Sequence, residues 1–112
     1  MTDRLEIVVS TDPAHALVCL RGECDITTAE ELRDTLADQA RVDPPLILAD
    51  MAGLEFIDAA GIHALLDAHM ALVRKEKRLV LLSPQPIVGR VLNITGVDLL
   101  IPIRQSLPDE GA

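Results

Sequence analysis

Two short, continuous apolar runs constrain the fold more than any other feature of this chain. Leu46–Met51 (LILADM) and Leu79–Leu82 (LVLL) have the length of strands, and a segment with helical periodicity lies between them. Continuous apolar runs are typical of strands that are covered on both faces. Because strands and helices alternate here, we expect parallel strands joined by right-handed crossovers.

An antiparallel hairpin is predicted ahead of these units. Leu5–Val9 and His15–Gly22 have the pattern of strands, and Gly22 stops the second one. The turn signal Thr11–Ala14 (TDPA) between them is short. A short connection of this kind favours two neighbouring strands that run in opposite directions.

The next two helices each have a start signal. The first is predicted within Asp25–Ala40, where Thr28 and Glu31 form a capping-box pattern. The second is expected to begin at Asp58, a good N-cap residue, and Arg74–Arg78 (RKEKR) suits the negative end of its dipole. The predicted buried faces carry Ala29, Leu32 and Leu36 in the first helix and Ile62, Leu65, Leu66, Met70 and Val73 in the second.

A third helix and a last strand are predicted towards the C-terminus. Ser83 and Pro84 give an N-cap and a first-turn proline, and Gly96 is the expected stop. Leu99–Ile103 (LLIPI) is predicted as an edge strand, because Pro102 cannot donate a ladder hydrogen bond. The apolar stripe of this helix carries Ile87, Val88, Val91 and Leu92.

The predicted fold class is therefore α/β, with a mixed sheet and helices packed on it. The 112 residues suit one domain, 1–112, with its core in about 5–103 and a frayed tail in 104–112. Since Phe56 is the only aromatic residue, the core must consist of Leu, Ile, Val and Ala.

Charge and composition exclude several classes of function. A net charge of -8 disfavours binding to nucleic acid or to an acidic membrane surface, and it fits a protein partner with a basic face. No apolar leader follows Met1, and no apolar run reaches the roughly 18 residues that a membrane span needs. We therefore expect a cytoplasmic protein in which Cys19 and Cys24 are reduced, small apolar residues.

The carboxyl edge of the predicted sheet is the expected place for a site. Asp25, the Gly53–Asp58 loop and Ser83 all follow predicted strands and would lie along it. Ala59 and Ala60 open the helix at this edge, where free N–H groups favour a phosphate, but neither carries a hydroxyl group. The structural alternative is that alanine suits the first helical turn and glycine at position 61 permits close packing.

The residues offer little for catalysis or metal binding. Asp25 and Asp58 could be paired carboxylates, but no nucleophile accompanies them, and both are explained as residues at helix starts. The three histidines show no metal-ligand spacing, and no P-loop or GxGxxG motif is present. His63 and Asp67 are expected to form a solvated pair, and His69 a satisfied, half-buried histidine. No enzyme activity, metal or cofactor is predicted.

Three segments in order resemble the STAS domain family. LRGECDITTAEELRDTL resembles the family's GELD strand-to-helix motif, LILADMAGLEFIDAAGIHALL its central strand and DSSG helix start, and LSPQPIVGRVLNITGVDLLIPI its closing strand-helix-strand unit. Together they cover about residues 5–103. The chain looks like a stand-alone bacterial member of the anti-sigma factor antagonist type.

The resemblance implies a partner and a switch. Such proteins bind an anti-sigma factor with a GHKL-type serine kinase fold and so free its sigma factor. In regulated members the kinase phosphorylates the residue after the motif's Asp, and a phosphatase reverses this. Here that Asp is Asp58 and the acceptor position is Ala59, so an engineered or natural form that cannot be phosphorylated is implied. The implied partner-binding residues are Asp25, Thr27, Gly53, Asp58, Ala59, Ala60, Gly61, His63 and Ser83.

Two other functions stay open at this point. Within the same fold, the chain could be a scaffold subunit of a stressosome-like or lipid-transport complex. Outside it, a small enzyme or nucleotide-binding domain could work at the same sheet edge, although it would lack a nucleophile, a metal set and a P-loop.

Overall fold

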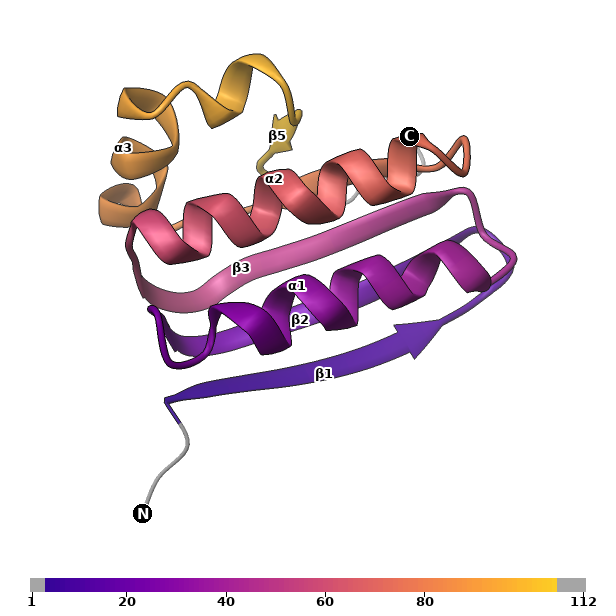
Figure 1. Cartoon of the computed structure of the whole chain (residues 1–112), viewed down its shortest axis with the longest axis horizontal. Coiled ribbons are helices and arrows are strands. Elements are labelled where there is room, and N and C mark those ends of the chain that lie inside the picture. The colour runs from indigo at the N-terminus through magenta and orange to yellow at the C-terminus, as the bar shows by residue number, and fades with distance from the viewer. Residues whose placement is uncertain (1–3, 107–112) are drawn as a thin grey trace.

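Five strands form one sheet in which every strand lies beside its neighbours in the sequence. The computed structural model describes residues 4–106, and the strand order is β1-β2-β3-β4-β5 (Figure 1). Only β1 and β2 pair in antiparallel fashion, and the three other pairs are parallel. This confirms the predicted hairpin and mixed sheet. The strands are β1 (Leu5–Thr11), β2 (His15–Cys24), β3 (Leu46–Ile57), β4 (Arg78–Leu82) and β5 (Ile103–Arg104).

Two helices lie side by side on one face of the sheet. They are α1 (Ala29–Asp38) and α2 (Ala59–Val73), and Figure 1 shows both in front of β2 and β3. The third helix, α3 (Pro86–Ile94), stands at the end of the molecule where α2 begins. Short 3-10 turns follow α1 and α3, at Gln39–Arg41 and Val97–Leu99. No helix within residues 4–106 combines the length and the apolarity that crossing a membrane requires.

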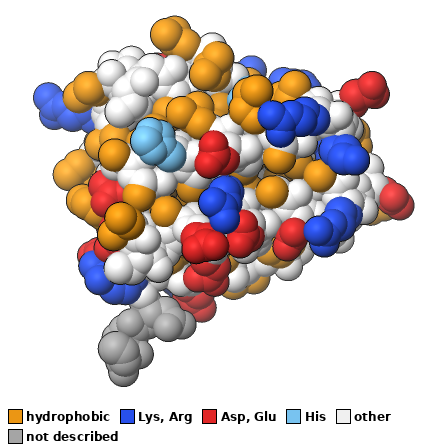
Figure 2. Space-filling view, in the orientation of Figure 1, with side chains coloured by type: hydrophobic (Ala, Val, Ile, Leu, Met, Phe, Trp, Pro, Cys, Tyr) orange, Lys and Arg blue, Asp and Glu red, His pale blue; other side chains and the backbone are white. Residues whose placement is uncertain are grey.

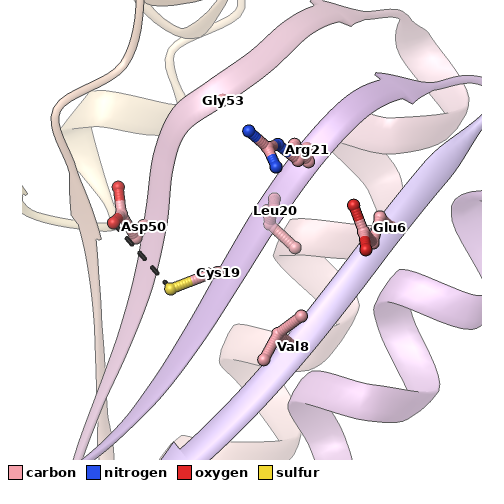
Figure 3. A pocket seen from close by; sticks show the side chains of 7 residues that line it. All are labelled: Glu6, Val8, Cys19, Leu20, Arg21, Asp50 and Gly53. Carbon is pink, nitrogen blue, oxygen red and sulfur yellow. Dashed lines mark hydrogen bonds between the residues drawn. The ribbon is translucent and has the colours of Figure 1, made fainter.

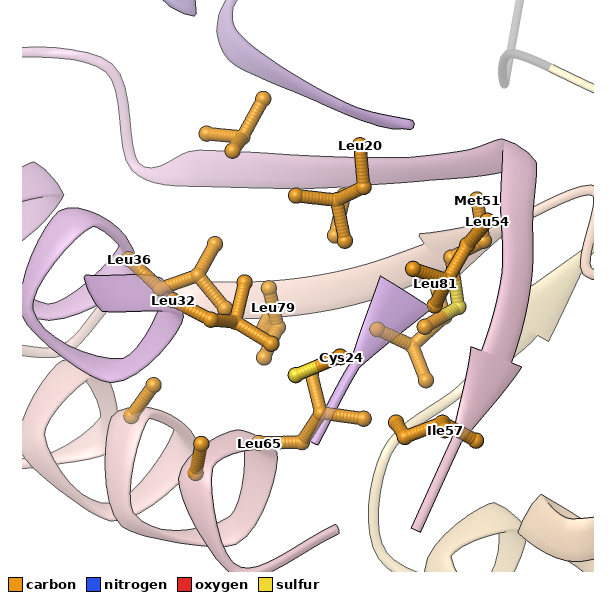
Figure 4. Packing of buried hydrophobic residues seen from close by; sticks show 14 of the residues in the cluster. Leu20, Cys24, Leu32, Leu36, Met51, Leu54, Ile57, Leu65, Leu79 and Leu81 are labelled. Atoms are coloured by element: carbon orange, nitrogen blue, oxygen red, sulfur yellow. The ribbon is translucent and has the colours of Figure 1, made fainter. Parts of the chain in front are cut away.

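The core between these helices and the sheet is aliphatic, as the composition predicts. Figure 4 shows helix residues such as Leu32 and Leu65 facing strand residues such as Leu79 and Leu81. All four are at most 1% exposed. Removing their apolar surface from water is the main favourable contribution to folding.

Strand β3 is longer than the sequence predicted. It continues to Ile57, and its pairing with β2 runs to the Cys24–Ile57 pair. The predicted Gly53–Asp58 loop is therefore wrong. The register between β2 and β3 shifts at two places, so the usual alternation of buried and exposed residues breaks down and hides the strand.

Thr28 is the N-cap residue of α1 as predicted, but its predicted capping box does not form, and the predicted cap of α3 is wrong. Thr28 makes no side-chain cap hydrogen bond, because its hydroxyl donates to the Glu23 carbonyl and accepts from the Asp25 N–H. Ser83 does not begin α3, which starts at Pro86 after Gln85. The Ser83 backbone has a φ of 53°, and its hydroxyl donates to the Gln105 carbonyl at 2.6 Å.

The C-terminal part differs from the predicted edge strand. Leu99 lies in a 3-10 turn, and β5 contains only Ile103 and Arg104. Gly96 has a φ of 83° just after α3, which confirms the predicted stop. Residues 104 and 105 of the predicted frayed tail hydrogen-bond to the end of β4, and residues 107–112 lie outside the described residues.

Three apolar residues that were assigned to buried helix faces are exposed. They are Met70 and Val73 on α2 and Ile87 on α3. Leu72 and Val88, which are their neighbours in the sequence, are buried, so the buried face of each helix is turned away from part of the predicted stripe. The rest of the α2 stripe is buried or half-buried, as predicted.

Candidate functional site

The carboxyl edge of the sheet is stepped, so it brings together only part of the predicted site. Strands β2 and β3 end at the same level, at the Cys24–Ile57 pair. Strand β4 ends earlier, because Leu82 pairs with Asp50. Asp25 and the start of α2 are therefore neighbours, and the Asp58 N–H donates to the Cys24 carbonyl at 3.2 Å. Ser83 follows β4 at the lower step.

Gly53 lies on the body of the sheet and not in the predicted loop. It pairs with Arg21, and a Cβ atom here would lie 2.9 Å from the Leu20 carbonyl oxygen. Gly53 helps to line a shallow pocket of about 260 Å³ together with Cys19 and Asp50 (Figure 3). The structure therefore assigns Gly53 and Ser83 to places other than the start of α2.

We call the remaining predicted residues around the start of α2 the α2 entry surface. Asp25 is its most strongly held side chain. One carboxylate oxygen accepts from the Thr27 hydroxyl at 2.6 Å and from the Thr27 N–H at 2.9 Å, and the other lies 2.9 Å from the Arg4 guanidinium. These hydrogen bonds lower the pKa of Asp25, and the bond from the Thr27 hydroxyl is the largest cause of the shift. The surface consists of Asp25, Thr27, Asp58, Ala59, Ala60 and His63.

The lowered pKa of Asp25 gives a prediction for acid stability. Because the pKa of Asp25 is lower in the folded protein, its ionised carboxylate stabilises the fold at pH values above about 3.9, the pKa of an unfolded Asp. This stabilisation is lost as the pH falls through the pKa that Asp25 has in the folded protein. We therefore expect wild type to be more stable than Asp25→Asn at neutral pH. The difference should disappear in acid. Urea unfolding at a series of pH values measures it.

A control for this prediction removes the largest cause of the shift. Thr27→Val keeps the carboxylate and deletes the hydroxyl donor, so its stability should fall between wild type and Asp25→Asn at neutral pH. A deficit of Asp25→Asn that is equal in acid and at neutral pH would show that the charge of Asp25 does not stabilise the fold.

Asp58 caps α2 as predicted. One of its carboxylate oxygens accepts from the N–H groups of Ala60 at 3.0 Å and Gly61 at 3.2 Å. These are orphan donors of the first helical turn, and the negative charge also suits the positive end of the helix dipole. Ala59 is the first residue of the helix and is exposed. A larger side chain at position 59 would therefore reach solvent or a bound partner.

Gly61 lies where the helix meets the sheet. A Cβ atom on it would lie 2.6 Å from Cγ1 of Ile57 and 3.0 Å from Sγ of Cys24. The structural reason given for this glycine, close packing, is confirmed, and Gly61 is buried. Burial also raises the pKa of the Cys24 thiol to about 11, so the thiol is protonated and unreactive at neutral pH.

A groove between α1 and α2 extends the α2 entry surface. It encloses about 190 Å³, with small side chains from both helices and charged side chains along its rim. Of its lining residues, only Ala60 and His63 were predicted as site residues. The signal that was missed is the small size of the facing residues, Ala29 on α1 and Ala60 and Ala64 on α2. Small side chains at these positions let the two helices approach each other. The groove is lined by Ala29, Glu30, Arg33, Ala60, His63, Ala64 and Asp67.

Acidic side chains gather over the exposed side of α1, and basic ones gather towards the far end of α2 (Figure 2). The charges beside the groove are partly paired. Arg33 lies 3.0 Å from Asp34 and 3.5 Å from Glu30. An acidic surface beside an apolar groove fits a protein partner with basic side chains.

Neither of the two histidine predictions is confirmed. His63 and Asp67 both line the groove, but no hydrogen bond or ion pair joins them among the interactions of residues 4–106. His69 was expected to be satisfied, and this is wrong: its Nδ1 atom is buried without a hydrogen-bond partner among the described residues.

Within residues 4–106, no three His, Cys, Asp or Glu side chains lie close enough to hold a metal ion. The α2 entry surface offers two fixed carboxylates, exposed small residues and one exposed histidine. This arrangement suits a docking surface on a rigid scaffold.

Comparisons with known proteins point to one family. An anti-sigma-B factor antagonist of Staphylococcus aureus is 25% identical over 101 residues, which cover 90% of this chain and 94% of that protein. The structure of an anti-sigma factor antagonist from Mycobacterium paratuberculosis has a TM-score of 0.81 at 22% identity, covering 92% of this chain and 87% of that one. The anti-sigma factor antagonist SpoIIAA, in its unphosphorylated form, gives 0.74 at 21% identity, with 88% and 87% covered.

These solved structures show that the fold is shared. The sequence model of one family, the STAS domain, matches residues 6–110, which is nearly the whole chain. This match and the shared fold show that the chain belongs to the STAS domain family.

Proposed function

We propose that this chain is an anti-sigma factor antagonist. In this function it binds an anti-sigma factor in the bacterial cytoplasm and so frees a sigma factor for transcription. Membership of the STAS family and the name of the S. aureus relative support the proposal. The partner we propose is an anti-sigma factor with a GHKL-type serine kinase fold, and the chain itself needs neither a cofactor nor catalytic activity.

The observation that carries the proposal is the position of Ala59. It is exposed, it is the first residue of α2, and it follows the capping residue Asp58. In the DSSG pattern of related proteins this is the phosphoacceptor position. The chain therefore keeps a capped helix start at which a kinase could act, and it lacks the hydroxyl group at the acceptor position.

The chemistry of the α2 entry surface favours binding over catalysis. Asp58 is engaged by two backbone N–H groups, and Asp25 is engaged by Thr27 and Arg4. The Thr27 hydroxyl is used to hold Asp25 in place, and the nearby Cys24 thiol is buried with a pKa of about 11, so it is protonated at neutral pH. The same groups fix the shape of the surface, which lowers the entropy lost when a partner binds.

Without an acceptor, the proposed partner cannot turn this chain off by phosphorylation. Binding would then be controlled by the amounts of the two proteins. A phosphatase would act only on a form with Ser or Thr at position 59.

The test is a kinase and binding assay with Ala59→Ser. GHKL-type anti-sigma factors of the source bacterium are incubated with each variant and radiolabelled ATP. At least one of them should bind the wild-type chain, and at least one binder should label Ala59→Ser. After labelling, this variant should lose its affinity for the kinase, because about two negative charges enter an already acidic surface. The wild-type chain should bind and stay unlabelled.

The matched control is Ala52→Ser, which adds a hydroxyl at another exposed alanine on β3. It should bind like wild type and take up no phosphate. Binding to scaffold or membrane-transport proteins without any GHKL-type partner would reject the proposal in favour of a scaffold function.

A further inference from the structure

The structure points to a second interaction surface at the opposite side of the sheet from β5. We propose that the outer edge of β1 pairs in antiparallel fashion with β1 of a second copy, so that two five-stranded sheets join into one. This inference does not depend on the partner proposed above.

The outer edge of β1 is open and has few of the usual protections. Within residues 4–106, β2 is the only strand that pairs with β1, and β1 forms one border of the sheet (Figure 1). Its seven residues, LEIVVST, contain no Pro and no Lys, and its register with β2 has no bulge. Natural edge strands are usually shortened, bulged or carry such residues, because an open edge recruits other strands.

The other border of the sheet shows the contrast. Strand β5 is two residues long and follows Pro102, so it offers almost no edge for pairing. One border of this sheet is thus protected against another strand and the other is not. Two valines of the open border are also largely exposed, Val8 at 56% and Val9 at 41%.

Hydrogen bonds to β2 show which backbone groups of β1 are free for pairing. The Glu23 N–H donates to the Arg4 carbonyl, and the Asp12 N–H donates to the His15 carbonyl. Bonded and non-bonded pairs alternate along an antiparallel ladder. The even-numbered residues of β1 therefore bond to β2, and Leu5, Ile7, Val9 and Thr11 direct their N–H and C=O groups outward.

These outward groups match a second copy in one register. If two β1 strands cross at Val8, Ile7 pairs with Val9 of the second copy and Leu5 pairs with Thr11. All four outward residues of each copy are then bonded. Shifting the centre to Ile7 or Val9 leaves one end of the strand unpaired. A two-fold interface of this kind is isologous, so the same residues serve both copies.

Side chains agree with this register. Val8 meets Val8 at the two-fold axis, in a non-bonded pair where side chains approach most closely. Glu6 lies opposite Ser10, so no like charges meet. Just beyond the strand, Arg4 lies opposite Asp12 of the second copy. Opposite charges, and not like charges, therefore meet at each end of the interface, while Arg4 keeps its ion pairs with Asp25 and Glu23 of its own chain. Figure 3 shows Glu6 and Val8 on the same face of the sheet, as this pairing requires.

Sedimentation equilibrium of the full chain from micromolar to millimolar concentration tests the proposal. We expect a dimer whose fraction rises with concentration. Val8→Lys should weaken dimerisation by at least about tenfold, because two like charges meet at the axis. The matched control is Ile94→Lys, which makes the same kind of change at an exposed residue of α3 and should dimerise like wild type.

A second variant separates edge pairing from stacking of two sheet faces. Val9→Pro removes an outward N–H group and no bond to β2, so the fold is expected to survive, and circular dichroism checks this. Edge pairing should be lost in Val9→Pro, whereas stacked faces would be unaffected. Wild type that stays monomeric at millimolar concentration, or a Val9→Pro variant that dimerises like wild type, would overturn the proposal.

Discussion

Replacing Leu65 with alanine should lower the free energy of unfolding by about 2–5 kcal/mol. Leu65 is fully buried (0% exposed) on the face of α2 that meets the sheet, and its side chain lies among Cys24, Ile57 and other core residues (Figure 4). The loss has two parts: the transfer free energy of the deleted carbon atoms, and the cavity they leave. Neighbouring side chains held by five strands and two helices can close that cavity only in part.

The matched control is Met70→Ala on the same helix. Met70 belongs to the same apolar stripe in the sequence, but its side chain is 50% exposed in the structure. We expect Met70→Ala to cost less than about 1 kcal/mol, since much of its surface is already in water. Urea unfolding of both variants gives the two values. Equal losses would mean that the sequence stripe, and not the structure, describes how α2 packs.

Replacing Ala59 with glutamate should weaken binding of the proposed anti-sigma factor partner by at least about tenfold, on the scale of typical couplings between sites. The new carboxylate would lie beside Asp58 and near Asp25, so the docking partner would have to bury an extra, unpaired negative charge. Titration calorimetry with the purified partner measures the change.

The same substitution should not harm the fold. A carboxylate in the first turn of a helix interacts favourably with the helix dipole, by about 0.3–1 kcal/mol. Stability and binding should therefore move in opposite directions, which a misfolded variant cannot do. Ala52→Glu, at an exposed alanine of β3, is the control and should bind like wild type. Full affinity of Ala59→Glu would show that the partner docks elsewhere.

The sequence predicted the parts of the fold in which one physical signal dominates. Leu46–Met51 was predicted correctly as a strand because a buried strand needs a continuous apolar run. Asp58 was predicted correctly as a cap because a carboxylate at that place satisfies free N–H groups. The Gly53–Asp58 loop was wrong because register shifts against β2 remove the alternation by which strands are recognised.

The candidate site was predictable only near the start of α2. Ser83 was grouped with Asp25 on the assumption that strands end at one level, whereas β4 ends opposite Asp50. The groove between α1 and α2 was missed because it depends on how two helices pack, and the pattern of one helix does not contain that information. The side chain of Thr28 was predicted to cap α1, but its hydroxyl donates to the Glu23 carbonyl instead.

The capping bonds of Asp58 also determine how phosphorylation at position 59 would affect the structure. Because Asp58 already occupies the N–H groups of Ala60 and Gly61, a phosphoryl group on Ala59→Ser would find these donors taken and would project outward. Nothing in the first turn would need to rearrange around it. The two forms of such a variant should then superimpose, and the message would consist of charge displayed on an unchanged scaffold, to be read by whatever docks there.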